Sequence, residues 1–214
     1  VPVRLYLNKG ASTDGVRLVD VTDEAGLLAL PTKSPHVQVV DLDADGRPDI
    51  LTTASGADGR PVVFRQVDTT GEVPSFEATS PPGPAQYWVT AATADVDRDA
   101  ALDVVAVEWE PGRPTQVWRN AAAVGGSVAV TADVGTRVDA FRAGHLGESG
   151  HLLGSVTVGT STGYAAGPDP VAWMGLGSDA GADLLLTEPA GDQTRLVGVA
   201  SGQHVVCATG SEQR

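Results

Sequence analysis

Two short aspartate-rich segments, each set between runs of strand-forming residues, constrain the fold of this chain more than any other feature. Residues 41–49 read DLDADGRPD and residues 95–103 read DVDRDAALD, so both carry aspartate at positions 1, 3, 5 and 9, and their first aspartates are 54 residues apart. The flanking runs are rich in Val, Ile, Thr and Ala and show no helical period, which predicts strands. A repeat of this kind predicts two copies of one strand–loop–strand unit.

The spacing of these aspartates predicts two calcium ions, one in each loop. Calcium takes about six to eight oxygen ligands, and carboxylates at alternate positions converge when a loop wraps around the ion. Gly46 suits the sharp turn at position 6, whereas the second loop has Ala100 there, so the second site is expected to be harder to build. The expected ligands are the side chains of Asp41, Asp43, Asp45 and Asp49 with the backbone carbonyl of Arg47, and the side chains of Asp95, Asp97, Asp99 and Asp103 with the backbone carbonyl of Ala101.

Other interpretations of the two loops are weaker. An EF-hand needs a bidentate Glu at position 12 between two helices, but that position holds Thr52 in one loop and Ala106 in the other, and the flanks predict strands. Magnesium rarely uses a cage made of protein ligands alone. A solvated acidic turn is the remaining alternative, and it is disfavoured because four neighbouring carboxylates repel one another without a cation and the pattern occurs twice.

The composition favours an all-β chain with many turns. Apolar residues make up 42% and aromatic residues only 5%, so the core must consist mainly of Val, Leu and Ala, while 26 Gly and 14 Pro indicate frequent turns. From residue 121 onward, short strands separated by Gly-rich turns indicate a second β module. Further strands are expected over 3–8, 17–22, 61–66, 75–79 and 115–120, with a single helical turn over 22–27.

Charge and hydropathy exclude several classes of partner. The net charge of −13 argues against nucleic acid and against docking on anionic lipid, because both need clustered Lys and Arg. No apolar run approaches the length of a membrane span. Cys207 is the only cysteine, so no intramolecular disulfide is possible. The start at Val1 fits a mature secreted protein or a trimmed chain equally well.

Two known families resemble this sequence, and together they cover nearly all of it. The D-x-D-x-D-G-x-x-D loop between strands resembles the FG-GAP or VCBS repeat of integrin-type β-propellers. From about Gly135, the strings GTRVDAFRAG, STGY, VAWMGLGS, LLLTEPAGD and SGQHV resemble the ASPIC/UnbV module, which follows FG-GAP repeats in proteins similar to cartilage acidic protein. The sequence departs from that module at Ala172, and Glu188 to Gly191 replace its usual Trp-Pro-Gly.

The resemblance implies a domain plan and a setting. Residues 1–120 are expected to hold propeller-type calcium-binding repeats, with blades around 36–66 and 88–119, and residues 121–214 an ASPIC/UnbV-like β-sandwich or barrel. Structural calcium, an extracellular or periplasmic location and a role in binding or cell adhesion are implied as well. Two repeats cannot close a propeller of four or more blades, so the chain is a fragment, a part of an oligomeric propeller, or a compact relative with its own closure.

Two functions from different classes are therefore expected. In the first, calcium makes the repeats rigid and the C-terminal module presents a surface to a protein or glycan ligand of unknown identity. In the second, the chain is a small β-fold enzyme, for example a cytoplasmic cyclase of secondary metabolism, which folds its substrate in a shaped apolar pocket. A deep apolar cavity would favour the enzyme, and an exposed surface patch would favour binding.

Two weaker signals do not predict sites of their own. Residues 175–180 read GLGSDA, close to G-x-G-x-x-A, but a dinucleotide site needs a βαβ unit that this sequence lacks. The four histidines, His36, His145, His151 and His204, include no H-x3-H pair and none adjoins Cys207, so a zinc site is not expected.

Overall fold

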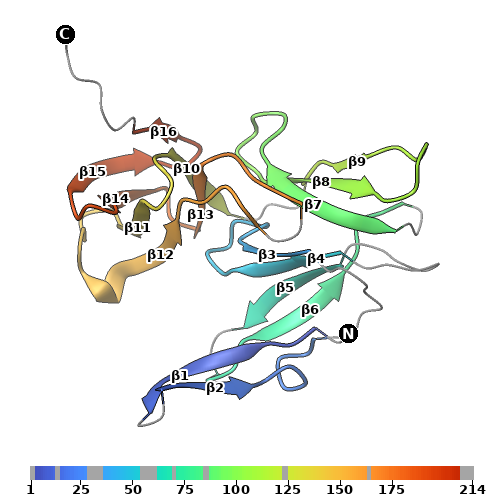
Figure 1. Cartoon of the computed structure of the whole chain (residues 1–214). Coiled ribbons are helices and arrows are strands. Elements are labelled where there is room, and N and C mark those ends of the chain that lie inside the picture. The colour runs from blue at the N-terminus through green and yellow to red at the C-terminus, as the bar shows by residue number, and fades with distance from the viewer. Residues whose placement is uncertain are drawn as a thin grey trace. The chain divides into compact units, whose positions relative to one another are not determined.

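The structure, a computed structural model, describes residues 3–12, 15–27, 36–53, 62–68, 71–83, 87–121, 125–162 and 165–207. Within these ranges it contains strands β1 to β16, one 3-10 helix and no α-helix (Figure 1). The predicted all-β fold is confirmed. The helical turn expected over 22–27 is present as a short hydrogen-bonded turn that does not continue into a helix: the N–H of Ala25 donates to Val21 O (2.8 Å), and the N–H of Leu27 donates to Thr22 O (3.1 Å).

The first repeat forms a four-stranded sheet with the strands in chain order. A separate antiparallel hairpin precedes it, and the first aspartate loop connects the first two strands of the sheet. The strand predicted over 75–79 is confirmed residue for residue, and part of the blade expected over 36–66 lies outside the described residues. The strands are β1 (Tyr6–Ser12), β2 (Gly15–Asp20), β3 (Val37–Val40), β4 (Asp49–Thr52), β5 (Val62–Asp68) and β6 (Ser75–Thr79).

The second repeat forms a three-stranded sheet in the order β7-β8-β9. Its strands are β7 (Trp88–Ala94), β8 (Asp103–Glu108) and β9 (Gln116–Trp118), and the second aspartate loop connects β7 to β8. The predicted strand–loop–strand unit is therefore present twice.

The C-terminal part is a sandwich of two sheets. One sheet has the order β13-β10-β16, with β10 and β16 parallel, and the other has the order β12-β11-β14-β15; neither closes into a barrel over the described strands. Val128 of β10, Val138 of β11, Met174 of β13 and Leu184 of β14 belong to one buried apolar cluster, so the two sheets share a core. The elements are β10 (Gly126–Thr131), β11 (Arg137–Arg142), the 3-10 helix Ser149–His151, β12 (Leu152–Thr157), β13 (Val171–Gly177), β14 (Gly181–Thr187), β15 (Gln193–Ala200) and β16 (His204–Val206).

The chain divides into two compact units. The N-terminal unit comprises Val1–Val39, Pro48–Ala91 and Ala106–Gln116, and the C-terminal unit comprises Val40–Arg47, Ala92–Val105 and Val117–Arg214. The N-terminal unit has its own apolar cluster, built from Val21, Ala25, Leu27, Ile50, Phe64 and Phe76. The C-terminal unit combines the sandwich with the second aspartate loop and most of the first. A domain boundary between residues 120 and 121 stays a prediction, and residues 122–124 of the expected joint lie outside the described residues.

Candidate metal centres

The first aspartate loop folds back onto its leading carboxylate. Asp41 Oδ1 accepts a hydrogen bond from the N–H of Asp45 (3.2 Å), and Asp41 Oδ2 accepts one from the N–H of Gly46 (2.8 Å). The N–H of Arg47 donates to Asp45 Oδ1 at 2.8 Å. Ala44 and Gly46 have φ values of 59° and 89°, in the left-handed region that non-glycine residues seldom occupy. These two residues turn the chain around the carboxylates.

The second loop repeats these three hydrogen bonds. Asp95 Oδ1 accepts from the N–H of Asp99 (3.1 Å), Asp95 Oδ2 accepts from the N–H of Ala100 (3.1 Å), and the N–H of Ala101 donates to Asp99 Oδ1 (3.0 Å). Arg98 and Ala100 have φ values of 63° and 69°, at the same loop positions as the left-handed residues of the first loop. The sequence repeat is therefore also a repeat of backbone geometry.

Three carboxylates gather in each loop, from positions 1, 3 and 5. In each group the ligand oxygens lie within 4.8 Å of one another. Two like unit charges about 5 Å apart repel by about 3 kcal/mol at an effective dielectric constant of about 20, so a cation bound among them would relieve this repulsion. Oxygen ligands of this kind suit a hard cation such as calcium. The two groups are Asp41, Asp43 and Asp45, and Asp95, Asp97 and Asp99.

The aspartates at position 9 lie outside these groups and are fully buried. Asp49 Oδ1 accepts a hydrogen bond from the N–H of Gln66 at 2.9 Å. Asp103 accepts two, from the N–H of Val96 (3.0 Å) and from the N–H of Asn120 (2.7 Å). These bonds fix the first residue of β4 and of β8 to neighbouring segments. Whether either carboxylate also binds metal stays a prediction.

An arginine already neutralises one carboxylate of each group. The Arg47 guanidinium pairs with Asp45 in the first loop, and the Arg119 guanidinium pairs with Asp97 in the second. A bound calcium ion would compete with both pairs. The predicted ligand role of the Arg47 and Ala101 backbone carbonyls stays a prediction.

The sandwich contacts the first loop through glycine backbone. The N–H of Gly177 donates to Ala44 O at 3.0 Å. A Cβ atom placed on Gly175 would lie only 1.8 Å from Asp41 Oδ2, closer than real Cβ atoms approach any atom. The two glycines that gave residues 175–180 their likeness to a dinucleotide motif thus allow a strand to pass directly beside the loop.

Two polar side chains that the sequence did not single out hold the loops in the C-terminal unit. Asn120 Nδ2 donates to Leu42 O in the first loop and to Leu102 O in the second (3.1 Å for the latter), so one amide group joins both. Ser127 Oγ donates to Ala100 O at 2.6 Å. Each forms its bond with a residue at least 18 positions away, and a single sequence carries no signal for contacts at that separation.

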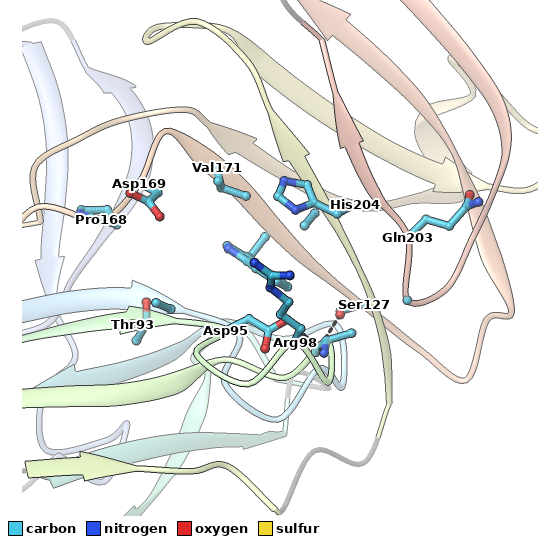
Figure 2. A pocket seen from close by; sticks show the side chains of 14 residues that line it. Thr93, Asp95, Arg98, Ser127, Pro168, Asp169, Val171, Gln203 and His204 are labelled. Atoms are coloured by element: carbon cyan, nitrogen blue, oxygen red, sulfur yellow. Dashed lines mark hydrogen bonds between the residues drawn. The ribbon is translucent and has the colours of Figure 1, made fainter.

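A pocket of about 600 Å³ lies between the second loop and the sandwich, within the C-terminal unit. Asp95 and Arg98 line it from the loop, and Asp169, Trp173 and His204 line it from the sandwich. Figure 2 shows the Arg98 side chain extending from the loop toward the side of the pocket on which His204 lies. His204 Nε2 is 2.7 Å from Thr131 Oγ1, and its ring lies 6.3 Å from that of Trp173. The lining therefore mixes charged and polar groups with small apolar residues and one large aromatic surface.

The FG-GAP-like repeat family matches residues 41–106. This span begins at the first aspartate of the first loop and runs through the second loop into β8, so both aspartate loops lie within the part of the chain that is similar to an FG-GAP-like repeat. No curated protein matches the chain. The resemblance of residues 135–214 to an ASPIC/UnbV module stays a prediction. None of the helices in the described part of the chain has the length and hydropathy needed to cross a membrane.

Proposed function

We propose that this chain is a calcium-stabilised β-repeat binding protein that presents a polar ligand site beside its second loop. The observation that carries the proposal is the pair of loops with the same three hydrogen bonds, the same left-handed residues and the same group of three carboxylates. A solvated turn has no need to reproduce all of these features twice. Two calcium ions, one per loop, account for them.

The proposed calcium sites have a structural role. Each loop is bonded to other parts of the C-terminal unit, through Gly177 and Asn120 for the first and through Asn120 and Ser127 for the second. A cation that holds a loop in shape therefore also holds the segments bonded to it. Sites of modest affinity would be filled at extracellular calcium levels, which agrees with an extracellular or periplasmic location.

The pocket supports a polar ligand such as a glycan. Sugar hydroxyls pair well with carboxylate, guanidinium and imidazole groups, and a sugar ring can lie on an aromatic face. Asp169, Arg98, His204 and Trp173 supply these groups. Asp95 both lines the pocket and belongs to the second carboxylate group, so ligand binding at this site should depend on calcium. The enzyme alternative calls for a deep apolar cavity, whereas the charged side chains of Asp95, Arg98 and Asp169 line this pocket beside its apolar residues, which favours a polar ligand.

Screening the whole chain against a glycan array, with calcium and with EDTA, tests the proposal. Binding should occur in calcium, and it should be lost in EDTA and in the variants Asp99→Asn and Trp173→Ala. Asp192→Asn is the matched control, because Asp192 is an exposed carboxylate in a turn of the same unit. Glycan binding that persists in EDTA, or an array without any signal, would contradict the proposed ligand class.

A further inference from the structure

The connection between β11 and β12 brings two histidines and a glutamate together. Glu148 Oε2 lies 3.1 Å from His145 Nδ1 and 3.8 Å from His151 Nε2. One ligand atom from each of the three side chains lies within 4.8 Å of the other two. The two imidazole rings stack with centroids 3.7 Å apart and an interplanar angle of 11°. The three side chains are 40%, 41% and 60% exposed, so solutes can reach all of them.

Three consecutive backbone turns produce this arrangement. The N–H of His145 donates to Arg142 O (3.0 Å), that of Glu148 to His145 O (3.0 Å), and that of His151 to Glu148 O (2.9 Å). Gly144 and Gly147, the third residues of the first two turns, have φ values of 83° and 84°, which a side chain would disfavour. Each turn advances the chain by three residues and ends on one of the three polar side chains. The backbone is thus already ordered at all three positions.

The chemistry of the three groups is that of a transition-metal site. Imidazole nitrogen suits zinc, copper and nickel, whereas calcium takes oxygen ligands alone. In a tetrahedral zinc site with bonds of about 2.0–2.1 Å, neighbouring ligand atoms are about 3.3 Å apart. The observed separations of 3.1 Å and 3.8 Å lie on either side of that value. The nitrogen lone pairs lie in the ring planes, so the two stacked and exposed imidazole rings must rotate out of the stack to bind one shared ion.

We propose that His145, Glu148 and His151 form a zinc-binding site of the type H-x2-E-x2-H, separate from the aspartate loops. The fourth ligand position faces solvent and would hold water or a ligand atom from another molecule. The inference does not depend on the proposed function, because none of the three residues belongs to the loops or to the pocket.

Calorimetric titration of the full chain with zinc chloride tests the site, with calcium in saturating excess so that the aspartate loops are occupied. One zinc ion per chain is expected. Loss of an outer-shell partner weakens metal binding by about 10- to 100-fold, so loss of a ligand in His145→Ala or His151→Ala should weaken it by more than about 100-fold. The control Glu77→Gln, which changes an exposed glutamate on β6, should bind zinc like the unaltered protein.

Nuclear magnetic resonance of the imidazole nitrogens gives a second measurement that needs no substitution. Zinc should shift the signals of His145 and His151 together, at one equivalent, and leave those of His36 and His204 in place. Absence of zinc saturation in calorimetry, or equal shifts at all four histidines, would overturn the proposal. So would retention of full zinc affinity in both alanine variants, because the zinc would then be bound elsewhere.

Discussion

Gly175→Ala should damage the first loop from a residue that lies more than 120 positions away in the sequence. The new Cβ would lie 1.8 Å from Asp41 Oδ2 and 2.8 Å from the backbone carbon of Ala44, so the loop must move by about 1 Å or more. Asp41 Oδ2 is held in place by the N–H of Gly46 at 2.8 Å, and Ala44 offers only rigid backbone. Neither contact can yield without distorting the loop.

The expected size of the effect follows from this clash. Overpacking a tightly packed site lowers the free energy of unfolding by about 1–3 kcal/mol. If the same free energy is lost from calcium binding at the first loop, calcium binds there about 5- to 150-fold more weakly. Gly154→Ala in β12 is the matched control, because nothing lies within 4 Å of the position of its new Cβ. This variant should be more stable than the unaltered protein by about 0.4–1 kcal/mol, because alanine lowers the conformational entropy of the unfolded chain. Urea unfolding and calcium calorimetry measure both variants. Equal behaviour of the two would refute the proposed contact.

Three further predictions concern the loops and a buried histidine. Ala100→Gly removes a left-handed alanine (φ 69°) and should strengthen calcium binding at the second loop by about 1 kcal/mol, or roughly 5-fold, in calorimetry; unchanged affinity would show that this residue is not strained. Arg119→Gln frees Asp97 from an exposed ion pair and should raise calcium affinity at the second loop by about 1.4- to 5-fold. Weaker calcium binding in this variant would show that Arg119 does not compete with calcium for Asp97. Burial lowers the pKa of His36, and a side-chain hydrogen bond with Gln38 partly offsets this shift. Below about pH 6.5 the unfolded chain therefore binds a proton at this histidine more readily than the folded chain does, and the free energy of unfolding falls. In saturating calcium, His36→Phe should reduce the change in the urea unfolding midpoint between pH 7.5 and 5.5. If the midpoint still changes with pH as in the unaltered protein, other groups cause the loss of stability.

The strands and the loops could be predicted because their signals are local. The alternation of polar and apolar residues over 75–79 is enough to place β6, and the spacing of the aspartates is enough to predict that the carboxylates at positions 1, 3 and 5 gather. The different residues at position 6, Gly46 and Ala100, also have the left-handed φ that the turn was expected to need.

The remaining features depend on contacts that one sequence does not reveal. The grouping of both loops with the sandwich depends on bonds made by Asn120 and Ser127 to distant backbone carbonyls. Neither H-x3-H spacing nor proximity to Cys207 indicates the gathering of His145 and His151. Consecutive turns instead bring residues three and six apart together, and the glycines within 142–151 are the local signal that could have indicated such turns.

The number of calcium ions bound per chain tests the central claim most directly. Equilibrium dialysis of the purified chain against millimolar calcium, followed by elemental analysis, should give two ions per chain. Asp43→Asn and Asp99→Asn should each reduce this number to one, because each removes a carboxylate from a different group, and Asp192→Asn should leave it at two. A value of zero in the unaltered protein would show that the loops are solvated acidic turns.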